Sequence, residues 1–369
     1  MNKVEALRTK MVEQGVDLIA LGPGAHLQWL TGMKPHADER PLIYCLSAEH
    51  AGILMPSLEA ESARMQTDLP FFEWSDAEGP AEALERLLEA QGGKPVRSLV
   101  LDETMRADHA ALIHDRVMNA KRQFSESTIG ALRARKMADE YDILKTNAQI
   151  ADAAMCAAWE AMRPGMSELE VAEVARSKFR QLGAKPIFNI VGAGGNGAMP
   201  HHHTGDTVLK HGDVVVMDIG GARDGFSSDI TRMAVVGEAP EEYHKVHAVV
   251  EAAVQAAMQA ARPGVRAHEL DDAARRVITD AGYGEYFMHR LGHGMGVEVH
   301  EPPYISASSQ TVLDEGMVFS IEPGIYLPGR FGLRLEDIVI LRADGPEIFS
   351  ELSREVRVID AVEVQVPCP

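Results

Sequence analysis

A hairpin-like stretch, Val214–Met233, carries two carboxylates, Asp218 and Asp229. Asp224-Gly225 is a strong signal for a two-residue turn between its apolar runs. Counting outward from that turn places Gly220 opposite Asp229, so Asp218 and Asp229 become diagonal neighbours on one face, about 7–8 Å apart at the backbone. Two carboxylates held in this way can bind hard divalent cations. A solvated hairpin with two surface aspartates is the alternative that this stretch alone leaves open.

An internal repeat indicates that this hairpin has a counterpart. The segment Ala161–Gly165 reappears as Ala260–Gly264, at an offset of 264 − 165 = 99 residues. Farther along, Gly212–Asp218 matches Gly316–Glu322 at an offset of 316 − 212 = 104 residues. Each repeat has helical patterns followed by a hairpin, which predicts a pseudo-twofold domain with helices outside its sheets.

The second hairpin, Met317–Ile340, carries the other two carboxylates. If Pro328–Arg330 forms a three-residue loop, Glu322 and Glu336 lie directly opposite each other on one face. Four carboxylates buried in an apolar sheet would repel one another unless cations compensate their charge. The sequence therefore predicts a cation site between the two hairpins, and Gly220 is expected to leave room for the metal.

A segment rich in histidine and glycine, Phe287–Pro303, lies between the hairpins. His289 and His293 have the i, i+4 spacing of a helical zinc pair, but the glycines at 292, 294 and 296 argue against a helix and favour a backbone that runs close to a site. One imidazole joining four carboxylates is a mixed nitrogen and oxygen set, which suits manganese, cobalt, iron or zinc.

The remaining pattern predicts an α/β chain of two domains, 1–127 and 128–369, divided near the short polar segment Gln123–Ile129. The first is a small α/β domain and the second carries the repeat. Helices are expected at Met1–Gln14, Ala81–Ala90, Ala131–Met162 and Ser167–Leu182, and strands at Val16–Leu21, Leu42–Leu46, Gly52–Met55, Ser98–Leu101 and Ile187–Val191.

Several classes of function are disfavoured. The net charge of −19 argues against nucleic acid or an anionic membrane as a partner. Gly192, Gly194 and Gly197 match a dinucleotide-binding pattern, but the loop residues that follow leave no room for the required helix. Three cysteines give no disulfide framework, and we expect neither a signal peptide nor a membrane span, which favours a cytoplasmic setting.

Taken in order, these residues resemble the dinuclear metallopeptidases of the pita-bread fold, which include prolidase, aminopeptidase P and methionine aminopeptidase. The motifs are MDIGG–FSSDITR, HRLGHGMGVEVHE, FSIEPGIY and GLRLED, within residues 130–360. The first domain resembles the N-terminal domain of prolidase and creatinase. Creatinase lacks the metal-ligand set, and methionine aminopeptidases generally lack the N-terminal domain.

The resemblance implies a role for each site residue. The metal ligands would be Asp218, Asp229, His293, Glu322 and Glu336, with Asp229 and Glu336 bridging two ions. His201 and His300 would act on the scissile carbonyl and the substrate, and Glu322 would also pass a proton to the leaving nitrogen. His289 would line the substrate pocket, and Arg334 would contact the distal end of the substrate.

The activity that the resemblance implies is hydrolysis of an Xaa-Pro peptide bond by a water activated by two divalent ions, with manganese favoured over cobalt, zinc or iron. A prolidase acting on dipeptides is placed ahead of an aminopeptidase P acting on longer peptides. A non-peptidase amide hydrolase or lyase on the same scaffold stays open as well, and so does a non-catalytic binding relative. The expected partner is a small peptide substrate, and the resemblance implies a homodimer.

Overall fold

The structure, a computed structural model, describes residues 2–359, and its contacts divide the chain into two units, Met1–Arg133 and Ala134–Pro369. The division predicted at residues 127 and 128 falls at the end of the short helix η1 (Ser125–Ser127). Cys368 lies outside the described residues. Cys45 is a buried free thiol.

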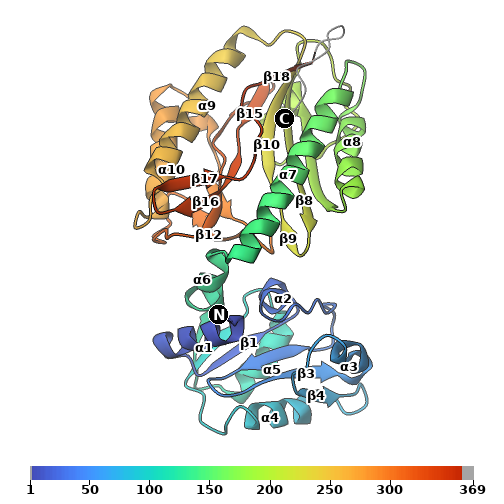
Figure 1. Cartoon of the computed structure of the whole chain (residues 1–369), viewed down its shortest axis with the longest axis vertical. Coiled ribbons are helices and arrows are strands. Elements are labelled where there is room, and N and C mark those ends of the chain that lie inside the picture. Colours follow the sequence, from blue (N-terminus) through green and yellow to red (C-terminus); the bar gives the residue numbers. More distant parts are fainter. Residues whose placement is uncertain (1, 360–369) are drawn as a thin grey trace. The chain divides into compact units, whose positions relative to one another are not determined.

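The N-terminal unit is a six-stranded mixed sheet with the strand order β4-β3-β2-β1-β5-β6, flanked by helices (Figure 1). Side chains of α4 and α5 join those of the central strands in one apolar cluster, so these two helices cover the same face. The elements are α1 (Lys3–Gln14), β1 (Leu18–Leu21), α2 (Ala25–Thr31), β2 (Ile43–Leu46), β3 (Ala51–Pro56), α3 (Ser57–Arg64), β4 (Phe71–Trp74), α4 (Ala81–Glu89), β5 (Ser98–Leu101), α5 (Ala107–Arg116), β6 (Lys121–Phe124), η1 and α6 (Ile129–Ala134), which spans the division.

The segment Gln123–Ile129, expected as a polar boundary, contains regular structure instead. Its first residues end β6, which pairs in parallel with β5 at the edge of the sheet. Lys121 and Arg122 of this strand are exposed. An edge strand that faces water carries no apolar alternation, which is why the sequence pattern did not reveal it.

The C-terminal unit has helices on both sides of its sheets, as predicted, and its strands pair antiparallel except for β18, which is parallel to β10. One sheet has the order β18-β10-β8-β7, the other the order β12-β11-β13-β16-β17, and β14 and β15 form a two-stranded ribbon. Helices α7 and α8 lie to one side of the strands and α9 and α10 to the other (Figure 1). The elements are α7 (Ala138–Ala161), α8 (Glu168–Gln181), β7 (Lys185–Ala193), η2 (Gly194–Ala198), β8 (Val214–Arg223), β9 (Phe226–Ser227), β10 (Ile230–Val236), α9 (Glu241–Ala260), α10 (Ala267–Asp280), η3 (Gly284–Tyr286), β11 (Gly292–Gly294), β12 (Glu301–Ile305), β13 (Val318–Ile321), β14 (Gly324–Leu327), β15 (Phe331–Arg334), β16 (Asp337–Arg342), β17 (Gly345–Ile348) and β18 (Arg357–Ile359).

The predicted repeat is present in the backbone. Gly165 and Gly264 both have a positive φ, of 90° and 92°. The amide of Gly165 donates to the Leu209 carbonyl, and that of Gly264 donates to the Leu313 carbonyl, a position 313 − 209 = 104 residues later. The helix pairs α7–α8 and α9–α10 therefore follow the same path, and the offset changes from 99 to 104 as the sequence indicated.

The long helix expected over Ala131–Met162 is interrupted. It is divided into α6 and α7 because Arg135 forms a β-bridge with Met317 and the Lys136 amide donates to the Gly316 carbonyl. Pairing with the second repeat extends the chain between the two helices. A helical pattern in the sequence does not report such a distant partner.

The helix α8 begins as predicted. Ser167 is its N-cap and forms a reciprocal capping box with Glu170, and Gly183 after the helix has a φ of 75°. The capping box satisfies two amide donors at the helix start. It fixes where the chain enters α8, and so where the next residue, Glu168, is placed.

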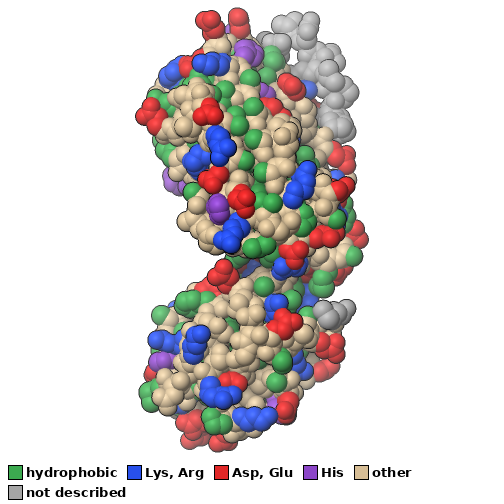
Figure 2. All heavy atoms as spheres, turned by 90° about the vertical axis from the view of Figure 1, so that its left-hand side faces the viewer, with side chains coloured by type: hydrophobic (Ala, Val, Ile, Leu, Met, Phe, Trp, Pro, Cys, Tyr) green, Lys and Arg blue, Asp and Glu red, His purple; other side chains and the backbone are tan. Residues whose placement is uncertain are grey.

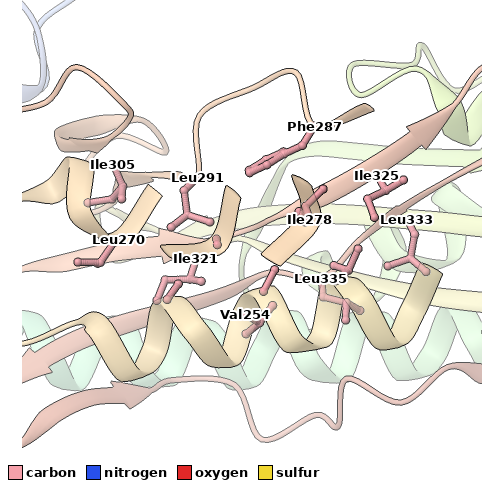
Figure 3. Packing of buried hydrophobic residues seen from close by; sticks show 14 of the residues in the cluster. Val254, Leu270, Ile278, Phe287, Leu291, Ile305, Ile321, Ile325, Leu333 and Leu335 are labelled. Atoms are coloured by element: carbon pink, nitrogen blue, oxygen red, sulfur yellow. The ribbon is translucent and has the colours of Figure 1, made fainter. Parts of the chain in front are cut away.

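Packing under α9 and α10 holds the second hairpin in place. Side chains from both helices interlock with those of the hairpin strands, and Figure 3 shows Val254, Leu270, Ile278, Phe287, Leu291, Ile305, Ile321, Ile325, Leu333 and Leu335 in this core. Each fully buried aliphatic side chain contributes about 1.5–3 kcal/mol. The strands that carry Glu322 and Glu336 are therefore anchored from the side opposite the site.

Acidic and basic side chains are interspersed on the face of the molecule seen in Figure 2, with scattered hydrophobic ones between them. The described residues of this face therefore present no continuous basic stripe of the kind that a nucleic-acid backbone requires. Among the described helices, none has the length and apolar character needed to cross a bilayer.

Candidate metal centre

The first hairpin has the predicted register. Asp224 and Gly225 form its turn with φ values of 53° and 85°, and Arg223 pairs with Phe226. The same register continues to Ile219 and Ile230, which places Gly220 opposite Asp229. Asp218 and Asp229 therefore point to one face, as the turn predicted.

Packing of the sheet requires Gly220. A Cβ at this position would lie 2.3 Å from Cε1 of Phe188 and 2.5 Å from the Ser228 carbonyl oxygen. The glycine makes room for the aromatic ring of β7 and for the neighbouring strand, and its expected role in leaving room for the metal stays a prediction.

The second hairpin also has the predicted register. Leu327 pairs with Phe331 across a three-residue loop, and Ile321 pairs with Asp337 beyond the ribbon. Both pairs belong to one register, in which Glu322 is opposite Glu336. The two glutamates lie where the strands pass from the ribbon β14–β15 into the larger sheet.

The four carboxylates and one histidine form two overlapping groups. Ligand atoms of Asp218, Asp229 and Glu336 lie within 4.8 Å of one another, and so do those of His293, Glu322 and Glu336. Glu336 belongs to both groups. This arrangement can hold two ions that share a bridging carboxylate.

The four carboxylates are largely buried and lie close together, so their negative charges oppose one another. One oxygen each of Asp218, Asp229 and Glu336 is buried without a hydrogen-bond partner among the described residues. Burial, together with the neighbouring carboxylates, raises the pKa of Asp229 and of Glu336 well above the usual range. Burial likewise raises the pKa of Glu322 to about 7. Divalent cations would satisfy these oxygens and compensate their charge, so the residues fit the metal ions that the sequence implied.

His293 presents a nitrogen lone pair to this cluster. Its Nδ1 lies 3.1 Å from the Gly294 carbonyl oxygen and must donate to it, so Nε2 is the unprotonated nitrogen. Nε2 faces Glu322 at 3.3 Å and Asp229 at 3.7 Å. Burial, followed by the charge of His300, lowers the pKa of His293 to about 3. A neutral imidazole in this orientation is a suitable metal ligand.

Arg334 is directed toward the carboxylates. Its guanidinium donates to Asp218, to the Tyr326 hydroxyl at 2.6 Å and to the Thr231 hydroxyl at 3.0 Å. Only 4% of its side chain is exposed. These contacts use three of its five N–H donors, and the expected contact of Arg334 with the distal end of the substrate stays a prediction.

The three remaining histidines border the site in different ways. His201 and His300 are exposed, and the ring of His300 lies 4.0 Å from that of His293 between centroids. His289 is hydrogen-bonded through Nε2 to the Tyr326 hydroxyl at 2.9 Å. Burial, followed by the charge of Arg334, lowers the pKa of His289 to about 4, so this imidazole is neutral near pH 7.

All the predicted site residues lie around one cavity of about 580 Å³. Its polar wall contains the carboxylates and histidines, and its apolar wall is formed by five side chains. The predicted residues are His201, Asp218, Asp229, His289, His293, His300, Glu322, Arg334 and Glu336, and the apolar ones are Ile187, Phe188, Ile190, Pro200 and Val299.

Sequence reasoning missed four residues that shape the site: Thr231, Tyr326, Glu168 and Arg290. The first two connect Arg334 with Glu336 and His289. Glu168 is fully buried and accepts hydrogen bonds from four groups of the segment 193–205, which carries His201. Thr231, Tyr326 and Arg290 lie within the motifs FSSDITR, FSIEPGIY and HRLGHGMGVEVHE, and Glu168 lies at the start of α8, but the sequence alone assigned none of them a role in the site.

Comparison with known proteins agrees with this geometry. The model of metallopeptidase family M24 matches residues 142–343, and that of the creatinase/prolidase N-terminal domain matches residues 3–134. A probable dipeptidase PepE of Mycobacterium tuberculosis is 37% identical, covering 94% of this chain and 93% of the relative. An Xaa-Pro dipeptidase of Pyrococcus horikoshii is 33% identical, with 96% and 98% covered.

The fold is shared with solved structures as well. The crystal structure of dipeptidase PepE from Mycobacterium ulcerans matches with a TM-score of 0.92 and 34% identity, covering 97% of each chain. The structural match extends over both units of this chain, and the M24 family model matches the C-terminal unit. The chain belongs to metallopeptidase family M24 and carries a creatinase/prolidase N-terminal domain.

Proposed function

We propose that this metallopeptidase is a prolidase, which hydrolyses the Xaa-Pro bond of dipeptides. The observation that carries the proposal is the pair of ligand groups that share Glu336 at the wall of one cavity. Relatives named Xaa-Pro dipeptidase, which match nearly the full chain, support the same activity. A dipeptidase without a preference for proline is the second candidate, because other relatives are named only as dipeptidases.

In this proposal Asp229 and Glu336 would bridge the two ions, Asp218 would complete one site, and His293 and Glu322 would complete the other. When bound, such ions lower the pKa of water and polarise a carbonyl group. Manganese fits the ligand types, which also suit cobalt, zinc and iron. A homodimer belongs to the same proposal and rests on the family resemblance, and a cytoplasmic setting rests on the low cysteine content.

The side chains of the cavity would then act on the substrate. His201 and His300 border the polar wall and can donate hydrogen bonds to the oxyanion of the tetrahedral intermediate. Glu322 is placed to transfer a proton to the leaving nitrogen. In an Xaa-Pro bond that nitrogen carries no hydrogen, and the apolar side chains of Ile187 and Phe188 can receive the pyrrolidine ring.

A substrate panel tests the proposal. The protein is loaded with Mn²⁺, its metal content is measured, and turnover of Ala-Pro, Ala-Ala and Ala-Pro-Ala is compared before and after chelation. We expect two ions per chain and metal-dependent turnover of Ala-Pro above that of the other two peptides. Turnover of Ala-Pro-Ala without turnover of Ala-Pro would favour aminopeptidase P, and equal turnover of Ala-Ala would favour a general dipeptidase.

A further inference from the structure

Arg290 is a cation at the wall of the cavity that has no anionic partner among the described residues. It lines the cavity together with His300 and Glu322. Within residues 2–359 its guanidinium takes part in no ion pair, whereas Arg334, the other arginine of the cavity, is paired with Asp218. Arg290 is therefore the cation of this wall whose charge remains available to a ligand.

An aromatic ring holds Arg290 in place. The guanidinium carbon lies 4.5 Å from the centroid of the Tyr304 ring, and Tyr304 pairs with His293 across β11 and β12. Tyr304 is 39% exposed. A guanidinium that lies over the face of an aromatic ring is stabilised by the ring and needs no carboxylate partner. Its N–H groups point outward in the plane of the guanidinium, where they can donate to an anion. The contact therefore orients Arg290 beside a metal-ligand histidine.

Arg290 is next to His289 in the chain and shares the cavity wall with His300 and Glu322. An anion bound by Arg290 would consequently lie in the same cavity as the reacting carbonyl.

A dipeptide substrate contains an anion that Arg290 can bind, its C-terminal carboxylate. A dipeptide ends in a free carboxylate one residue beyond the scissile bond, and four buried carboxylates in the same cavity disfavour that negative charge. Recognition of the carboxylate therefore requires a nearby cation, and a guanidinium can bind it through two parallel hydrogen bonds. A longer peptide moves its carboxylate outward by about 3.5 Å per residue, out of reach of a fixed guanidinium.

We propose that Arg290, held by Tyr304, binds the C-terminal carboxylate of the substrate and so restricts the enzyme to dipeptides. The proposal rests on the proposed function, since it assigns the group that recognises a dipeptide. Arg290 acts on binding of the substrate and takes no part in proton transfer.

The test compares a free carboxylate with its uncharged amide. Steady-state hydrolysis of Ala-Pro and of Ala-Pro amide is measured for the wild type, Arg290→Ala and Arg290→Lys, each with its Mn²⁺ content determined. For Arg290→Ala we expect KM for Ala-Pro to rise on the order of 10- to 100-fold, because the variant loses a hydrogen-bonded pair between charged groups. KM for the amide should stay unchanged, and Arg290→Lys should recover part of the effect. Arg276→Ala, at an exposed position of α10, is the matched control for loss of a positive charge.

The outcomes separate this proposal from the proposed function. If Arg290→Ala changes KM for both substrates equally, or for neither, the assignment of Arg290 is overturned although the enzyme is a prolidase. If the wild type hydrolyses no dipeptide, the proposed function fails, and calorimetric binding of L-proline and L-prolinamide to the Mn²⁺-loaded protein still tests Arg290. The wild type should prefer L-proline and Arg290→Ala should lose that preference, whereas an unchanged preference contradicts the assignment.

Discussion

The Thr231 hydroxyl donates a hydrogen bond to Oε2 of Glu336 at 2.7 Å, and the Glu336 amide donates to the Thr231 carbonyl at 3.2 Å. Thr231 belongs to the first repeat and Glu336 to the second. This bridge is therefore one of the points at which the two hairpins are joined, and it involves the residue whose carboxylate is shared by both ligand groups.

Replacing Thr231 by valine tests whether this hydroxyl orients Glu336. Valine keeps the shape of the side chain but removes the donor to Glu336 and the acceptor for Arg334. Loss of such a supporting contact typically lowers metal affinity about 10- to 100-fold. Titration of the apoprotein with Mn²⁺ measures the effect, and Thr231→Ser, which retains the hydroxyl, should bind nearly as well as the wild type. Equal affinity for valine and threonine at this position would contradict the role.

Asp229→Asn tests the coupling between metal and stability. In the metal-free protein the substitution replaces a buried carboxyl group whose ionisation its neighbours oppose, so the melting temperature should stay the same or rise. With Mn²⁺ present, the wild type should gain about 2.7 kcal/mol at a free concentration of one hundred times Kd, and the variant should gain much less. Thermal unfolding with Mn²⁺ and with chelator measures both effects. A variant that is destabilised equally in the two conditions would show that Asp229 is a structural residue.

The registers of both hairpins could be predicted from the sequence because each is fixed locally. The side-chain period of a strand is two residues, so the turn decides which residues share a face. Asp224-Gly225 can adopt the positive φ values that a two-residue turn needs, and Pro328–Arg330 closes the other hairpin with three residues. From these two turns follow the positions of Asp218, Asp229, Glu322 and Glu336.

The features that were missed depend on partners far away in the sequence. The break before α7 results from pairing with Met317, and Gly220 is required by the ring of Phe188. Arg334 is directed to Asp218, which precedes it by 116 residues. Local propensity contains no information on such contacts, so the positions of the carboxylates could be predicted better than the network that orients them.

His300 tests the division between metal ligands and substrate contacts. Its ring lies 4.0 Å from that of His293, and its nitrogen is also close enough to Asp229 to act as a ligand. If His300 contacts the substrate, His300→Ala should lower kcat about 100-fold and leave two ions per chain. His293→Ala is the comparison and should lose metal. Loss of metal from His300→Ala would move this residue to the ligand set.

Glu168 is expected to position the loop that carries His201. Its two oxygens accept from the Ala193 amide at 2.8 Å, from Asn196 and His202, and from the Gly205 amide at 3.1 Å. In Glu168→Gln one acceptor becomes a donor, which leaves a loop amide unpaired and costs about 1–3 kcal/mol. The loop should then become mobile, so kcat should fall at unchanged metal content.

Limited proteolysis measures the mobility of the loop, with cleavage within residues 193–205 expected only for Glu168→Gln. Glu170→Gln at the start of the same helix is the control, because glutamine retains the capping box. Lower kcat without faster cleavage of the loop would argue against a positioning role.

A charge network in the N-terminal unit predicts a pH dependence away from the metal centre. Arg133 donates to Nδ1 of His26 at 2.9 Å, so Nε2 of His26 donates to Glu103 at 3.4 Å. Ser125 donates to Glu103 through its hydroxyl at 2.6 Å. Burial alone would raise the pKa of Glu103, but the hydrogen bonds from His26 and Ser125 outweigh it and lower the pKa to about 2.

Because the folded pKa of Glu103 is depressed below its ordinary value of 4.5, its contribution to stability is complete above pH 4.5 and is lost as the pH falls toward 2. The side chain is 40% exposed, so after discounting for solvent screening we expect about 1 kcal/mol relative to Glu103→Gln near pH 7. Urea unfolding at several pH values measures the difference. Fluorescence of Trp29 and Trp74 in a Trp159→Phe background follows this unit alone. The difference between the two proteins should shrink below pH 4.5, and a difference that stays constant down to pH 3 would show that the carboxylate charge contributes nothing.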